Sequence, residues 1–372
     1  MRLFCGFAML FFLAGCGGKA TPRPLYVGHV ATLSGPGKEE GEQASRGIRL
    51  AVLEQNKAAA EENGRPVVVR HTDTRGKLEA FEAEAVRLVA VNRVLALLGG
   101  TSNEEIMRLD RAQAPLVSPF GMHLRGQTEL VFLTGLAPAF QGQVLARFAG
   151  EKWGPVKGVI LVDERREEAI ALAEAFAREL SKAGKDPKGP LPRPITWRYG
   201  KEKDSFAELD KRLGAEKPGA ILVAGAISDL AKFRKDFPSS AMILYGGDIP
   251  GRAFLESPDS DGVHLAIPFV SDVDVPLAKE FVANFRKAFS EDPDVSAALA
   301  YDGARLLFEA MRKSEPLVGG EKIAKELARL KDFPCLTGPL SFAEDRRLRR
   351  PAFLVRVEMS RLKTLKRFAA VD

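Results

Sequence analysis

The sequence predicts an α/β fold of two doubly wound, Rossmann-like lobes, each a parallel sheet with helices on both faces. Short apolar runs alternate with amphipathic stretches in which apolar residues recur at helical spacing. The turns between them are short and carry Gly or Asn, and such an alternation is typical of parallel sheets covered by helices. One series occupies about residues 25–137 and a second about 138–271, which suits a chain of 372 residues with two domains.

Each series is expected to contribute five strands. The apolar runs of the first series are 25–31, 66–72, 94–99, 114–119 and 130–135. Those of the second series are 156–163, 194–200, 219–226, 241–247 and 262–268. Between the early strands, residues 41–63 and 77–92 have the apolar spacing of amphipathic helices.

The last quarter of the chain has a different pattern. Residues 275–330 look helical without strands, so they must pack on an existing lobe rather than form a third sheet. A last strand signal at 351–359 follows an apolar stretch at 336–342, and we therefore expect the chain to cross between the lobes more than once. The expected lobes are residues 25–137 with 272–334, and residues 138–271 with 335–372.

The first residues form a segment that we expect to be removed. Arg2 precedes about a dozen mostly apolar residues, too few for the roughly 20 that a membrane-spanning helix needs. The run ends in "LAGC" at Cys16, which resembles the lipobox of bacterial lipoproteins. The resemblance implies a signal peptide over 1–15, a lipid on the Cys16 thiol and a lipidated, flexible tether over 16–24. The alternative is an ordinary cleaved signal with an incidental cysteine.

Composition and motifs argue against several classes of function. Basic residues exceed acidic ones by six, but they are scattered among Glu and Asp, a pattern of solvated helical faces rather than of a nucleic-acid-binding stripe. Cys335 has no partner for a disulfide and is expected to pack as a small apolar residue, and the four histidines lack metal-ligand spacing. No GxSxG, HExxH or CxxC motif occurs. We expect a binding protein that is not an enzyme, with no catalytic residues, no cofactor, no metal and no nucleic-acid partner.

The expected fold also predicts where a ligand binds. Open parallel sheets bind ligands beyond the carboxyl ends of their strands. Here those ends are "ATLSGPG" (31–37), "GGTSN" (99–103), "SPFGM" (118–122), "DERR" (163–166), "GAIS" (225–228) and "GGDIP" (246–250). They offer hydroxyls, backbone N–H groups and helix N-termini, which suit a small polar or anionic ligand.

Taken together, several segments resemble the type I periplasmic binding proteins, in particular their leucine/isoleucine/valine-binding branch. The matching segments are "VGHVATLSGPGKEEGEQASRGIRLAVLEQN", "DTRGKLEAFEAEAVRLV", "VLALLGGTSNEEIMRLDRAQAPLVSPFG", "LYGGDIPG", "ALAYDGARLLFEAM" and "LTGPLSF". The resemblance implies two lobes joined by three crossovers that close on an amino acid, a branched-chain amino acid or a related metabolite. It also implies a monomeric, lipid-anchored protein of the bacterial cell envelope, which serves the permease and ATPase of an ABC importer. A sensor or an envelope-assembly scaffold built on the same clamp is the alternative.

The resemblance implies roles for individual residues as well. In the family, Ser- and Thr-rich turns of the first lobe hold a ligand carboxylate, and here Thr101 and Ser102 occupy that turn. Asp248 matches the acid that receives the ligand's ammonium. The expected ligand-binding residues are Ser34, Thr101, Ser102, Ser118, Phe120, Met122, Ala226 and Asp248. Thr101 and Ser102 are equally compatible with simple capping of the helix that follows.

Three positions depart from the family's pattern. Phe120 and Met122 stand where small and hydroxyl residues are usual, and Glu167 aligns with a common aromatic residue. These departures predict a more apolar pocket with an altered carboxylate grip, unless Phe120 turns into the core. Arg165 and Arg166 could face an anionic ligand, but their position at a helix start favours solvent.

Overall fold

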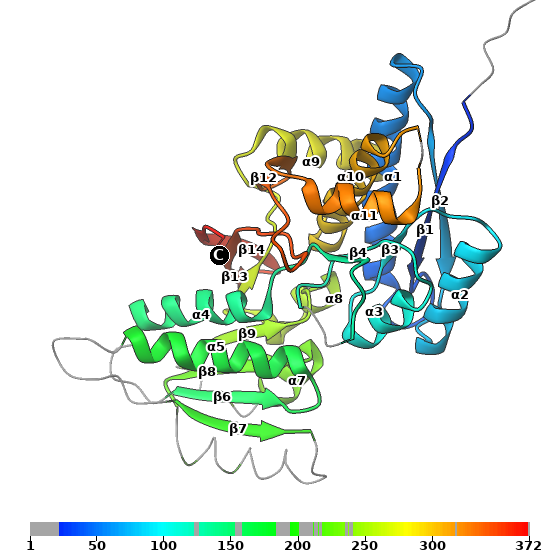
Figure 1. The fold of residues 1–372 in the computed structure, drawn as a ribbon. Coiled ribbons are helices and arrows are strands. Elements are labelled where there is room, and N and C mark those ends of the chain that lie inside the picture. Colours follow the sequence, from blue (N-terminus) through cyan, green and yellow to red (C-terminus); the bar gives the residue numbers. More distant parts are fainter. Residues whose placement is uncertain are drawn as a thin grey trace, which may run out of the picture.

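Among its described residues, the computed structural model contains two large β-sheets, each with helices on both faces, and one small two-stranded sheet (Figure 1). It describes residues 22–122, 126–152, 158–183, 194–200, 211, 215, 218–234, 237, 241–316 and 318–370. The predicted signal peptide and Cys16 lie outside these residues. The mixed α/β architecture predicted from the sequence is confirmed. No helix in the described part of the chain has the length and apolar character needed to cross a membrane.

The first sheet has five parallel strands in the order β2-β1-β3-β4-β5. They are β1 (Leu25–Ala31), β2 (Val67–Asp73), β3 (Leu97–Gly99), β4 (Leu116–Ser118) and β5 (Val131–Leu133). Alternate strand residues face opposite sides of a strand. Leu98 and Val117 accordingly belong to the core under α1 (Lys38–Glu61), whereas Leu97 and Leu116 pack toward α2 (Leu78–Ala90) and α3 (Asn103–Asp110). This sheet is therefore covered on both faces.

The second sheet has the order β14-β13-β10-β9-β8-β6-β7. Its five parallel strands are β6 (Gly158–Asp163), β7 (Ile195–Tyr199), β8 (Ala220–Gly225), β9 (Met242–Gly247) and β10 (His264–Ile267). The helices of this part are α4 (Pro138–Lys152), α5 (Glu167–Ala183), α7 (Ile227–Arg234) and the short α8 (Arg252–Leu255), and a 3-10 turn spans Pro258–Ser260. Ile160 and Leu222 pack under α4 and α5, and Leu161 and Val223 lie in the core with α7, so this sheet too is covered on both faces.

The expectation of a wholly parallel second sheet is wrong at one edge. There β13 (Ala352–Glu358) runs antiparallel to β10, and β14 (Arg361–Phe368) runs antiparallel to β13. The sequence pattern indicated the first of these strands but not the second. Most side chains of β14 are exposed and half of them are charged, so its backbone pairing with β13 defines it rather than an apolar periodicity.

The helical segment after β10 packs on the first sheet. It forms α9 (Pro276–Phe289), α10 (Val295–Lys313) and α11 (Gly320–Arg329). The contact between α1 and α10 is so close that a Cβ atom on Gly47 would lie 2.1 Å from the carbonyl oxygen of Ala297. Cys335 is buried at the end of β11 (Phe333–Cys335), which pairs with β12 (Gly338–Leu340), and this confirms its expected packing.

The chain passes between the two sheets three times, after β5, after β10 and before β13. The stretch that precedes β13 contacts the first sheet. Phe342 packs edge-on against Phe132 with ring centroids 5.2 Å apart, and Leu133 exchanges backbone hydrogen bonds with Arg346 and Leu348. The division into lobes stays a proposal, and these contacts favour a third crossing after Leu348 rather than at Cys335.

Candidate functional site

Two adjoining cavities lie at the carboxyl ends of the parallel strands, where the two sheets face each other. The first encloses about 230 Å³ and is lined by the turns after β1 and β3 and by α1 and α10, with Ile249 reaching in from the second lobe. The second encloses about 200 Å³ and has walls from both lobes. The residues common to both cavities are Glu40, Thr101, Pro119, Ile249 and Leu299. The cavities are thus two halves of one cleft.

Thr101 and Ser102 border the cleft and also stabilise the start of α3. The Ser102 hydroxyl accepts a hydrogen bond from the backbone N–H of Glu105 at 3.3 Å, which is an N-cap interaction. The backbone N–H and the hydroxyl of Thr101 both donate to the Glu105 carboxylate, at 2.7 and 3.1 Å. The capping role considered for this turn is thus present, and its role in ligand binding stays a prediction.

Ser118 and Ser34 lie away from the two cavities. Ser118 is fully buried, donates to the carbonyl oxygen of Gly100 at 2.6 Å and accepts from the N–H of Phe120 at 3.1 Å. It therefore ties the turns after β3 and β4 together beneath the cleft. Ser34 is exposed and its hydroxyl donates to Asp73 at 2.6 Å, and this bond, together with backbone N–H groups that also donate to Asp73, lowers the pKa of Asp73 to about 2. The sequence grouped both serines with the ligand-binding residues because they stand at strand ends, but neither lines a cavity.

The remaining predicted residues lie at different depths. Phe120 lines the second cavity and also packs against the core under α2 and α3, so the two roles considered for it are not exclusive. Met122 and Ala226, together with Ser102, line a wider outer opening of the cleft. The volume of this opening is about 1090 Å³. They border the entrance rather than the inner cavities.

Asp248 reaches the cleft but already has partners. One carboxylate oxygen accepts from Arg166 at 2.5 Å and the other from the backbone N–H of Ile227 at 3.0 Å. Arg166 also donates to Glu168 at 2.7 Å. Burial alone would lower the pKa of Arg166, but the bonds and charges of Asp248 and Glu168 outweigh it and raise that pKa. The solvent-facing position favoured for Arg166 is wrong.

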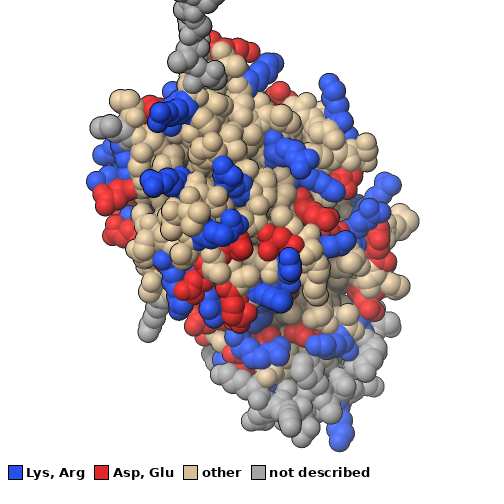
Figure 2. All heavy atoms as spheres, turned by 90° about the vertical axis from the view of Figure 1, so that its right-hand side faces the viewer, with Lys and Arg blue, Asp and Glu red and all other residues tan. Residues whose placement is uncertain are grey.

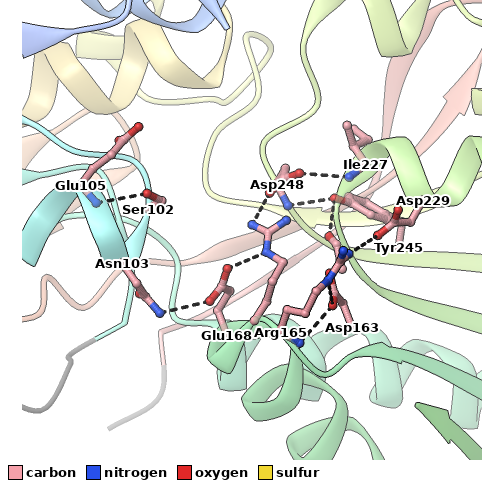
Figure 3. Close-up of polar contacts among 12 residues, drawn as sticks. Ser102, Asn103, Glu105, Asp163, Arg165, Glu168, Ile227, Asp229, Tyr245 and Asp248 are labelled. Carbon is pink, nitrogen blue, oxygen red and sulfur yellow. Dashed lines mark hydrogen bonds and ion pairs between the residues drawn. The ribbon is translucent and has the colours of Figure 1, made fainter. Parts of the chain in front are cut away.

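This charged network continues across the cleft to the first lobe. Figure 3 shows Asn103 of α3 pointing toward Glu168 of α5, to whose carboxylate it donates at 3.2 Å. Arg165, in contrast, folds back on Asp163 with two hydrogen bonds of 2.8 Å. The Arg166, Glu168 and Asn103 side chains thus form a polar bridge between the lobes that the sequence did not indicate.

Glu40 is a second residue that the sequence analysis missed. Its carboxyl group, on a half-buried side chain, lies where the two cavities meet, and among the described residues it makes no hydrogen bond or ion pair. Burial raises the pKa of Glu40 to about 8, with further contributions from the charges of Glu105, Asp248 and Asp294. In the sequence it resembles an ordinary acidic residue in the first turn of a helix.

Comparisons with known proteins agree with this geometry. A family model described as periplasmic binding protein matches residues 24–363. The leucine binding protein LivK from Thermotoga maritima is 20% identical, with a TM-score of 0.78 over 93% of this chain and 99% of that one. The substrate binding protein LivJ from Streptococcus pneumoniae, solved with isoleucine, is 23% identical, with a TM-score of 0.75 over 94% and 99%.

Another similar structure holds a different ligand. It is a solute binding protein of an ABC transporter from Rhodopseudomonas palustris in complex with 3,4-dihydroxybenzoic acid, 20% identical, with a TM-score of 0.75 over 94% of this chain and 98% of that one. A comparison with curated proteins gives no match. At these identities the similar structures establish the fold and leave the ligand open.

Proposed function

Since this chain belongs to the periplasmic binding protein family, we propose that it captures a small polar solute in the cleft between its lobes and delivers it to an ABC importer. The family consists of extracytoplasmic solute-binding proteins rather than enzymes. The proposed solute is an amino acid, a branched-chain amino acid or a related metabolite. The proposed location is the outer face of a bacterial membrane, where a lipid on Cys16 anchors a monomer.

The observation that carries the proposal is the composition of the cleft walls. The second cavity is lined by Thr101 and Phe120 from the first lobe and by Arg166 and Asp248 from the second. A solute bound there touches both lobes, so its binding energy favours their approach. The hydrogen bond from Asn103 to Glu168 supports this view, because it lies across the same opening.

The proposal is tested by identifying the solute that the protein carries. The protein is purified from its native membrane without denaturation, and the released small molecules are identified by mass spectrometry. The identified solute should raise the melting temperature in proportion to its concentration and should be recovered unchanged. If nothing co-purifies and no amino acid or aromatic acid shifts the melting temperature, the proposal is wrong. Chemical conversion of the solute would point to an enzyme instead.

A further inference from the structure

We propose that the solute is an organic cation whose charged group binds to Glu40 and whose apolar body fills the first cavity. This inference rests on the proposed solute-binding function and adds the charge and the orientation of the ligand. It differs from the arrangement expected from the sequence, in which Asp248 receives the cationic group and the turn at Thr101 receives an anionic one.

Glu40 is the acid of the cleft that is left without a partner among the described residues. Of the other acids lining the two cavities, Glu105 accepts two hydrogen bonds from Thr101, and Asp248 and Glu168 share Arg166. Glu40 instead projects from the first turn of α1 to the place where both cavities meet. A carboxylate that is partly removed from water and has no partner is unfavourable, so a ligand cation at this place would supply the missing interaction.

The charges around the cleft favour a cation over an anion. In the described lining of the two cavities, Glu40, Glu105, Glu168 and Asp248 face a single basic side chain, Arg166. Arg166 is held between two of these acids, so a ligand carboxylate would have to compete with them.

Asn103 adds a further acceptor at the outer opening. Its amide nitrogen donates to Glu168, which leaves its oxygen buried and without a partner among the described residues. A hydrogen-bond donor on the ligand could satisfy this oxygen, and a carboxylate could not.

The first cavity suits the apolar part of such a cation. Its apolar lining comes from both the sheet and the helices: Val30, Ile48, Phe81, Leu98, Val117, Leu299 and Ala300. An aliphatic chain placed here gains from burial, while an ammonium group at its end remains next to Glu40. An aliphatic ammonium has an ordinary pKa of about 10.4, so it arrives charged at neutral pH.

Binding of a cation at Glu40 is coupled to its protonation. Several groups face it: Glu105 from α3, Asp294 before α10, Asp248 after β9, Arg166 and Glu168 at the start of α5, and His29 from β1. The carboxylates among them favour the protonated form of Glu40 when the cleft is empty. A bound ammonium favours the ionised form, so the proton passes to water and the affinity rises with pH.

The test uses three probes with similar branched apolar bodies. L-leucine carries both charges, 3-methylbutylamine is leucine without its carboxylate, and 4-methylpentanoate is leucine without its ammonium. Their affinities are measured by calorimetric titration near pH 7.5 for the wild type, for Glu40→Gln and for Glu39→Gln. The last variant is the matched control, because Glu39 lines a different cavity on the far side of the α1 start.

The amine and leucine should bind the wild type, and Glu40→Gln should weaken both at least about tenfold while Glu39→Gln changes them less than about threefold. The inference is overturned if 4-methylpentanoate binds the wild type more tightly than the amine, or if Glu40→Gln leaves the amine affinity unchanged. Should none of the probes bind, the inference fails for this class of apolar body. The proposed function then stands or falls separately, with the solute that co-purifies.

Discussion

Replacing Glu40 by Gln should stabilise the ligand-free protein at neutral pH, because glutamine cannot ionise in the cleft. The ordinary pKa of this carboxyl group is 4.5, and in the folded protein it is raised to about 8. Between these values the folded state keeps a proton that the unfolded chain has released. The free energy of unfolding therefore falls as the pH rises from about 4.5 to 8, and glutamine, which does not titrate, removes this loss.

The shift sets an upper bound on the size of the effect. One pH unit corresponds to about 1.4 kcal/mol, and about 2.5 units separate the ordinary pKa of 4.5 from pH 7, so the bound is about 3.4 kcal/mol at that pH. Glu40 lines a cavity connected to the open cleft, and water there offsets part of the cost of its charge. We expect Glu40→Gln to raise the free energy of unfolding by about 1–2 kcal/mol at pH 7.

Urea unfolding followed by circular dichroism measures this effect from about pH 5 to pH 8. The difference between Glu40→Gln and the wild type should be near zero at the acidic end and should grow steadily toward pH 8. Glu39→Gln is the control, because it removes the neighbouring carboxylate. Its free energy of unfolding, plotted against pH, should run parallel to that of the wild type. A difference that stays constant over the whole range would refute the assignment of the raised pKa to Glu40.

Four further predictions address the anchor, the core and the cleft. Cys16→Ser should release the protein from membranes or leave it unprocessed, which cell fractionation and electrophoretic mobility detect; wild-type behaviour would contradict the lipobox. Asp302→Asn should cost about 3–5 kcal/mol in urea unfolding, because it leaves the buried guanidinium of Arg350, 3.5 Å away, without its counter-charge. Asn103→Ala should weaken binding of the co-purified solute two- to tenfold in calorimetry, since it removes one neutral-to-charged hydrogen bond across the cleft. Saturation with that solute should reduce the radius of gyration in small-angle scattering, and an unchanged profile would argue against closure.

The fold was predictable where buried residues form a continuous or periodic apolar pattern in the sequence. The residues of β8 are all buried, and its unbroken apolar run predicted a central parallel strand. At the edge of the same sheet the strand has no such apolar pattern. β14 carries four basic residues, loses its alternation at Thr364 and Leu365, is mostly exposed, and is defined by its hydrogen bonds to β13. Periodicity identifies strands through their apolar faces, so a charged edge strand is outside its reach.

The site was predictable only as far as strand topology determines it. The rule for parallel sheets placed Thr101 and Asp248 at the cleft, because both follow strands whose carboxyl ends face it. It gave no account of Arg166, which lies 82 positions before Asp248 and meets it only after the second lobe has folded. Glu40 was missed for a similar reason, since α1 alone would leave it exposed and the facing lobe and α10 enclose it.

The partners of Asp248 change what the second lobe contributes to recognition. Its backbone N–H donates to the Tyr245 hydroxyl at 2.9 Å, and its carboxylate accepts from the N–H of Ile227 (Figure 3). The carboxylate also accepts from Arg166. These bonds fix the acid in position and leave it little unused negative charge.

The surface outside the cleft is the other place where charge could select between solutes. Figure 2 shows Lys and Arg interspersed with Asp and Glu over one face, without a continuous patch of either sign. Because salt screens interactions between exposed charges beyond about 10 Å, this face attracts neither cations nor anions over a long distance. We therefore expect selection between solutes to occur inside the cleft. The second lobe supplies a preformed network and Glu40 of the first lobe supplies an unpaired carboxyl, so the gain from pairing that carboxyl discriminates a cation from an anion of the same shape.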